Sequence, residues 1–184
     1  MSTTQTLLTA EEYARLPDDG RPTELVRGKV VEMNPPTPKH GIICIEIGAI
    51  LRNYVKEHDL GRVAGNDSGV ITEHDPDTVR GADVAYYSYA KVPKGPVPAG
   101  YLKVAPEIAI EVLSPSDRWN ETHVKIAEYL DAGVAVVCVL DPATEKAHLF
   151  YRDKSPRALA GDEELAFPEQ LGDFRVAVRK LFEG

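Results

Sequence analysis

One stretch of the chain, residues 107 to 140, limits the possible folds more than any other, because an alternating strand, an amphipathic helix and an apolar strand follow one another there. Along Glu107–Leu113 every second residue is isoleucine or valine, so these side chains point to one face. A helix is expected over Asp117–Ala132, closed by Gly133. Val134–Leu140 is apolar throughout, which is typical of a strand covered on both faces. This order predicts an α/β (α+β) fold with a central mixed β-sheet.

Composition narrows the class of protein. Of the 184 residues, 43% are hydrophobic and 27% are charged, a balance that is typical of a globular chain, and we expect residues 1–184 to form a single domain. No apolar run approaches the roughly 18–20 residues of a membrane helix, and the first eight residues lack the pattern of a secretory signal. Cys44 and Cys138 lie in apolar stretches and cannot form a disulfide framework, so we expect a reduced, cytoplasmic protein without membrane contact.

The charge distribution bears on binding partners. The formal net charge of -8 has the wrong sign for a protein that binds nucleic acid by charge alone, since phosphate contacts dominate such binding. Residues 80–130, however, contain 6 basic and 6 acidic groups, whereas both flanks are acidic. If the chain binds DNA, this neutral part is the expected contact surface, with phosphates meeting Arg80, Lys91, Lys94 and Lys103.

A carboxylate inside the first of these strands is the main candidate for chemistry. Glu111 lies among apolar residues, and its same-face neighbours Ala109 and Leu113 offer no partner. Burying a carboxylate is costly unless it is paired or binds a metal ion. Asp83 opens another predicted strand, and two carboxylates on adjacent strands suit Mg²⁺ or Mn²⁺. The alternative is an edge strand with Glu111 in solvent and Asp83 as a turn cap, and spacing alone does not separate the two.

The helix after this strand carries polar residues along its border. At 100° per residue, Lys125 and Tyr129 lie between the apolar face and a solvent face that includes Glu128. A lysine at this border can lean over the end of the preceding strand and reach the carboxylate pair, with Tyr129 one turn beyond. The alternative is a solvated Lys125 that pairs with Glu121 one turn earlier.

Two residues outside these elements are further candidates. Glu24 begins a predicted hairpin and is either a third acidic group of the site or a surface residue of a strand. His40 lies in the first turn of a helix that follows a proline-rich loop, where Thr37 and Pro38 form a typical helix start. The histidines of the chain are scattered without the spacing of metal ligands, so the role of His40 stays open.

Several segments, taken in order, resemble the Uma family of restriction endonucleases, which belongs to the PD-(D/E)XK nuclease superfamily. The resemblance runs from about Leu8 to Phe182, and its most specific part is the Glu-Val-Leu-Ser-Pro-Ser sequence that starts at Glu111. It implies a restriction-endonuclease-like fold, in which helices flank a central mixed sheet. The matching segments are Thr23–Val31, His40-Gly41, Ala82–Val84, Pro106–Ser116, Lys125 with Tyr129, Gly133-Val134 and Leu140–Pro142.

The resemblance implies a metal site. Asp83 matches the aspartate of the first superfamily motif, although Ala82 precedes it where the motif has proline. Glu111 matches the acidic residue of the second motif. Together with the backbone carbonyl of Val112, these carboxylates are the implied ligands of Mg²⁺ or Mn²⁺.

The resemblance also implies a displaced catalytic lysine. The second motif normally has lysine two residues after its acidic residue, but this position is Leu113. The family pattern implies that Lys125 on the following helix replaces it, and this is the same lysine that the helical spacing selects. Glu24 is then an outer ligand, and Tyr129 positions Lys125.

These implications predict a metal-dependent endonuclease that hydrolyses phosphodiester bonds of DNA. A small chain with one site needs a second copy to cut both strands of a duplex, so a homodimer with two-fold symmetry is expected. The alternative is a catalytically silent domain of the same fold that acts as a protein-interaction or nucleic-acid-binding module. The acidic flanks and the missing Glu-x-Lys pattern favour this alternative, whereas Asp83, Glu111 and Lys125 favour the enzyme.

Overall fold

The computed structural model describes residues 7–17 and 20–183, and most of this part of the chain is organised around one large β-sheet. The first six residues, over which no secretory signal is expected, lie outside the described part. Within the described residues the large sheet has the order β2-β1-β4-β5-β6-β7-β8, with β3 paired to β4. Its strands are β1 (Thr23–Val26), β2 (Lys29–Glu32), β3 (Gly61–Glu73), β4 (Thr78–Ser88), β5 (Ile108–Val112), β6 (Val136–Asp141), β7 (Lys146–Phe150) and β8 (Arg157–Ala160).

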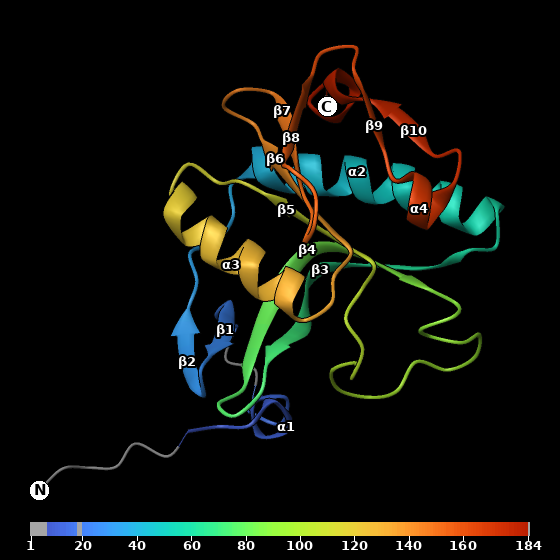
Figure 1. The fold of residues 1–184 in the computed structure, drawn as a ribbon. Coiled ribbons are helices and arrows are strands. Elements are labelled where there is room, and N and C mark those ends of the chain that lie inside the picture. Colours follow the sequence, from blue (N-terminus) through green and yellow to red (C-terminus); the bar gives the residue numbers. More distant parts are fainter. Residues whose placement is uncertain (1–6, 18–19, 184) are drawn as a thin grey trace, which may run out of the picture.

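A smaller sheet and the helices complete the fold (Figure 1). The strands β9 (Glu164–Ala166) and β10 (Arg175–Ala177) pair with each other near the C-terminus. The helices are α1 (Ala10–Tyr13), α2 (Pro38–Glu57), α3 (Trp119–Asp131), α4 (Pro168–Leu171) and the 3₁₀ helix η1 (Val178–Leu181). None of the helices in the described ranges is long and apolar enough to cross a lipid bilayer.

The predicted strand–helix–strand unit is present. β5 and β6 run parallel with Ile108 opposite Val136, and α3 is the connection between them. The second strand begins two residues later than predicted, because the N–H of Val134 donates to the carbonyl of Tyr129 and so belongs to the turn that ends the helix. Antiparallel neighbours on either side make the sheet mixed, so the predicted fold class is confirmed.

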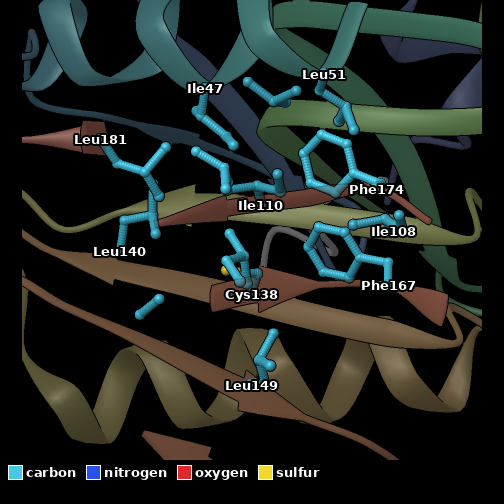
Figure 2. Close-up of a cluster of buried hydrophobic side chains, with 14 of the residues drawn as sticks. Ile47, Leu51, Ile108, Ile110, Cys138, Leu140, Leu149, Phe167, Phe174 and Leu181 are labelled. Atoms are coloured by element: carbon cyan, nitrogen blue, oxygen red, sulfur yellow. The ribbon is translucent and has the colours of Figure 1, made fainter. Parts of the chain in front are cut away.

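The two long helices cover opposite faces of the sheet. Ile47 of α2 belongs to one core with Ile108 and Ile110, and phenylalanines of the C-terminal region complete this core (Figure 2). Ile126 of α3 belongs to a second core with Ala109, the residue between them in β5. Because side chains of a strand alternate between faces, the apolar alternation predicted from the sequence supplies both cores. Figure 1 shows α2 and α3 on either side of β5.

A branch in the sheet positions the candidate site. β3 pairs with β4 along nearly its whole length, from Gly61 opposite Ser88 to Glu73 opposite Thr78. The other edge of β4 is shared, because β1 pairs with it at Val79 and β5 pairs with it only from Val84 onward. Residues 80–83 therefore lie where two strands diverge from a common neighbour.

Candidate active site

Charged side chains fill the gap between β1 and β5 and take the place of a neighbouring strand. The N–H of Gly81 donates to Oε1 of Glu24 at 2.9 Å, and its carbonyl accepts from Nζ of Lys125 at 2.9 Å. One strand further, the N–H of Val112 donates to Oδ2 of Asp83 at 2.7 Å. Buried backbone groups need hydrogen-bond partners, and the divergence of the strands leaves these groups without backbone partners. The branch in the sheet thus draws three charged groups into one buried region.

Glu111 is at the centre of this region. Its side chain accepts hydrogen bonds from Nζ of Lys125 at 2.8 Å and from the hydroxyl of Tyr129 at 2.8 Å. The residue is only 8% exposed. Burial raises the pKa of Glu111 to about 7, against the opposing charge of Lys125 and with a further upward contribution from Asp83. The alternative with Glu111 in solvent is therefore wrong.

Lys125 connects the carboxylates. Besides Glu111 and the Gly81 carbonyl, its Nζ lies 3.1 Å from Oε1 of Glu24. Burial alone would lower the pKa of this lysine, but the charges of Glu111 and Glu24 outweigh burial and raise the pKa above its usual value. Lys125 is therefore a fixed cation, and its predicted alternative pairing with Glu121 is wrong because its ammonium group faces the sheet.

Asp83 lies within reach of Glu111 and of helix α2. Its Oδ2 is 3.3 Å from Nε2 of His40, in the first turn of α2. Burial would raise the pKa of Asp83, but the hydrogen bond from His40 and its charge lower it below the usual value. The same contact raises the pKa of His40, although burial acts in the opposite direction. His40, whose role the sequence left open, therefore belongs to this cluster.

One acidic residue of the cluster was missed in the sequence analysis. Asp67 has a φ of 52° in the irregular part of β3, where the register with β4 shifts between Gly65 and Ser68. Burial and the charge of Asp83 raise the pKa of Asp67, so the two carboxylates are neighbours. The available signal was the run of turn-forming residues Asn66-Asp67-Ser68 inside a strand pattern, which indicates a β-bulge that redirects side chains.

Arg80 and Glu128 form a buried extension of the site. Nε and Nη2 of Arg80 donate to the two oxygens of Glu128 at 2.6 and 2.9 Å, and Nη1 donates to Glu24 at 2.8 Å. The expectation that Arg80 meets DNA phosphates is wrong, because its side chain is only 13% exposed and is occupied inside the protein. The expectation that Glu128 lies in water is also wrong, because a helical projection cannot foresee a buried cation on a neighbouring strand.

The structure brings all the sequence-predicted site residues into this region. Asp83 and Glu111 come from β4 and β5, Lys125 and Tyr129 from α3, and Glu24 from β1. The N–H and C=O of a strand residue point to the same neighbouring strand, so the Val112 carbonyl faces the β4 side together with its N–H. The cluster thus combines hard oxygen ligands with a fixed ammonium group, which suits hydrolysis assisted by a divalent cation. The individual catalytic roles stay predictions.

Comparisons with known proteins agree with the sequence resemblance. A family model described as "Uma2: Putative restriction endonuclease" matches residues 10–179. No curated protein matches the chain significantly. A solved structure, "a putative nuclease belonging to DUF820 from Anabaena variabilis ATCC 29413", superposes with a TM-score of 0.83 and 20% sequence identity, covering 95% of this chain and 97% of the other. At this identity the structural likeness establishes a shared fold.

Proposed function

Because the chain belongs to the Uma2 family, we propose that it is a metal-dependent endonuclease that hydrolyses phosphodiester bonds of DNA. The observation that supports this proposal most is the buried contact between Glu111 and Lys125, from two elements that meet beside Asp83. A structural ion pair does not require a third charged residue of the same sign as Glu111 in this place. An excess of buried carboxylate over ammonium is what a bound cation would neutralise.

The ligands available in this region fit a hard cation. Asp83 and Glu111 would hold Mg²⁺ or Mn²⁺ through carboxylate oxygens, and the Val112 carbonyl would add a neutral oxygen. Such an ion supplies polarisation of the scissile phosphate and a lowered pKa of a bound water molecule. Tyr129 donates to one oxygen of Glu111 and thereby restricts the orientation of that carboxylate.

Lys125 is the proposed catalytic cation. Its ammonium group is held by Glu111, Glu24 and the Gly81 carbonyl, so its position is set before any substrate binds. A preorganised positive charge in a buried site stabilises the charge that develops on a phosphate more strongly than the same charge in water. Glu24 is then a positioning residue, because it contacts Lys125 and anchors Arg80.

Metal-dependent stability tests this proposal. Mg²⁺ or Mn²⁺ at a hundredfold excess over its dissociation constant should stabilise the fold by about 2.7 kcal/mol, seen as a higher melting temperature. Glu111→Gln should abolish the shift and the cleavage of supercoiled DNA. Lys125→Met should abolish cleavage but keep most of the metal-induced shift, because Lys125 acts on the substrate. The matched control is Glu121→Gln, an exposed glutamate of the same helix.

The outcomes separate the enzyme from the silent module. A metal-induced shift together with cleavage that depends on both Glu111 and Lys125 supports the nuclease. A parent protein that cleaves no form of DNA and shows no shift supports a protein-interaction or nucleic-acid-binding module. A shift without any cleavage would also refute the enzyme and leave a metal-binding module.

Assembly and location complete the proposal. We propose that residues 1–184 act as one domain and form a homodimer, because two sites related by a two-fold axis can cut both strands of a duplex. Sedimentation velocity at micromolar concentration should show the dimer, and a monomer at every concentration would contradict it. Cys44 and Cys138 are both free, which fits the cytoplasm as the proposed location.

A further inference from the structure

Helix α2 presents a histidine and a cysteine to the same carboxylate that the nuclease site uses. His40 and Cys44 are four residues apart, so they lie on one face of the helix. Nε2 of His40 is 3.3 Å from Oδ2 of Asp83, and Sγ of Cys44 is 3.9 Å from the same Nε2. One ligand atom from each of these residues lies within 4.8 Å of the other two. Three different metal-binding groups therefore converge on one point.

The distances match a small tetrahedral centre. With Zn–N and Zn–O bonds near 2.0–2.2 Å and Zn–S near 2.3 Å, tetrahedral ligand atoms lie roughly 3.3–3.6 Å apart. The nitrogen-to-oxygen distance of 3.3 Å already has this value, and the nitrogen-to-sulfur distance of 3.9 Å needs a movement of a few tenths of an ångström. The side chains of His40 and Asp83 are 11% and 8% exposed, so their geometry is largely set by the fold.

The ligand types select a different ion from the one proposed for catalysis. Mg²⁺ prefers carboxylate and carbonyl oxygens, whereas a set with imidazole and thiolate prefers Zn²⁺ and related transition metals. Asp67 adds negative charge on the open side, since its charge acts on both His40 and Cys44. This leaves room for a fourth ligand, either Asp67 or water, as in zinc sites with three protein ligands.

We propose that His40, Cys44 and Asp83 form a Zn²⁺ site beside the catalytic centre, and that Zn²⁺ bound there inhibits the enzyme by engaging Asp83. The inhibition rests on the proposed nuclease function, whereas the Zn²⁺ site does not. Two effects weaken Mg²⁺ binding when Zn²⁺ is present. Asp83 donates part of its charge to Zn²⁺, and the two divalent cations repel each other in a region shielded from water.

Cobalt spectroscopy tests the site without any measurement of activity. Co²⁺ replaces Zn²⁺ in sites of this kind, and a thiolate ligand gives a sulfur-to-cobalt charge-transfer band in the near ultraviolet. The purified protein titrated with Co²⁺ should show this band, and Zn²⁺ should remove it by competition. Cys44→Ser and Cys44→Ala should both lack the band, and the use of two replacements guards against a folding defect in either. Cys138→Ala, which removes the other thiol, should keep it.

The Mg²⁺ site provides the complementary control. Glu111→Gln should keep the cobalt band, because Glu111 is not among the three ligands, and should lose the Mg²⁺-induced rise in melting temperature. Cys44→Ser should show the reverse pattern. In the wild type, one equivalent of Zn²⁺ should raise the Mg²⁺ concentration needed for half of the melting shift at least tenfold. In Cys44→Ser the same addition should change it less than twofold.

These outcomes distinguish the two proposals. A folded wild type without a cobalt band, or a band that survives in both Cys44 variants, would overturn the Zn²⁺ site. A band with no effect of Zn²⁺ on Mg²⁺ binding, or Zn²⁺-dependent activation that requires Cys44, would overturn the inhibition. Failure of the nuclease proposal looks different, because DNA cleavage and the Mg²⁺ shift would then be absent while the cobalt band remains and still depends on Cys44.

Discussion

Replacing Arg80 with methionine should destabilise the protein far more than an ordinary loss of a salt bridge. The guanidinium group donates two hydrogen bonds to Glu128 and one to Glu24, and the side chains of the three residues are 13%, 8% and 5% exposed. Arg80→Met keeps a side chain of similar length but removes the charge. Glu24 retains Lys125 and the Gly81 N–H, whereas Glu128 loses the cation that pairs with both of its oxygens.

The expected magnitude follows from this inventory. Removal of one partner from a buried ion pair costs about 3–5 kcal/mol, because the remaining charge is left without compensation. We therefore expect Arg80→Met to lower the free energy of unfolding by about 3–5 kcal/mol, a large part of the roughly 5–15 kcal/mol of a typical domain. The double variant Arg80→Met/Glu128→Leu should be more stable than Arg80→Met alone, since it removes the uncompensated carboxylate.

Urea denaturation of the metal-free protein, followed by circular dichroism, measures these differences. The control is Arg175→Met, which removes an exposed arginine whose side chain is 57% exposed and lies 3.5 Å from Glu164. This control should cost less than about 1 kcal/mol. A loss for Arg80→Met no larger than that of Arg175→Met would refute the buried network. A double variant less stable than Arg80→Met would refute the assignment of the loss to Glu128.

Three further predictions concern pH and glycine positions. Folding raises the pKa of Glu111 from 4.5 to about 7, so the stability that this residue contributes to the metal-free protein is full below about pH 4.5 and is lost as the pH rises to 7. The difference in unfolding free energy between the wild type and Glu111→Gln, measured by urea titration at pH 5 and pH 7.5, should therefore change in favour of the variant, and a constant difference would contradict the shift. Gly61→Ala should cost about 2 kcal/mol or more in thermal denaturation, because its Cβ would lie 2.1 Å from the Tyr87 carbonyl oxygen, and an unchanged melting temperature would contradict this close contact. Gly41→Ala should stabilise by up to about 1 kcal/mol, because it lies within α2 with no atom within 4 Å of the added Cβ, and a loss of stability would show that the position is constrained.

Local sequence patterns predicted the parts of this protein in which one element decides its own structure. The alternation in Glu107–Leu113 and the apolar run after α3 predicted the parallel pair β5–β6, since both signals come from residues close together in the chain. The buried position of Glu111 was also readable, because a carboxylate among apolar strand residues needs a partner wherever the strand lies. The spacing of α3 selected Lys125 as a residue that could reach this strand, and the structure contains the contact.

Tertiary structure alone decided how the remaining charges are arranged. Arg80 and Glu128 are 48 residues apart and meet only because β4 branches between β1 and β5 under α3. Asp67 reaches Asp83 because of an irregularity in the pairing of β3 and β4, and periodicity does not report such a change of register. Hydrophobic patterns record which face of an element leaves water, but the partner of a buried charge depends on the position of another element. For this reason the sequence by itself determined the fold class and the principal acids, while the packing of the sheet and helices determined which cation each acid meets.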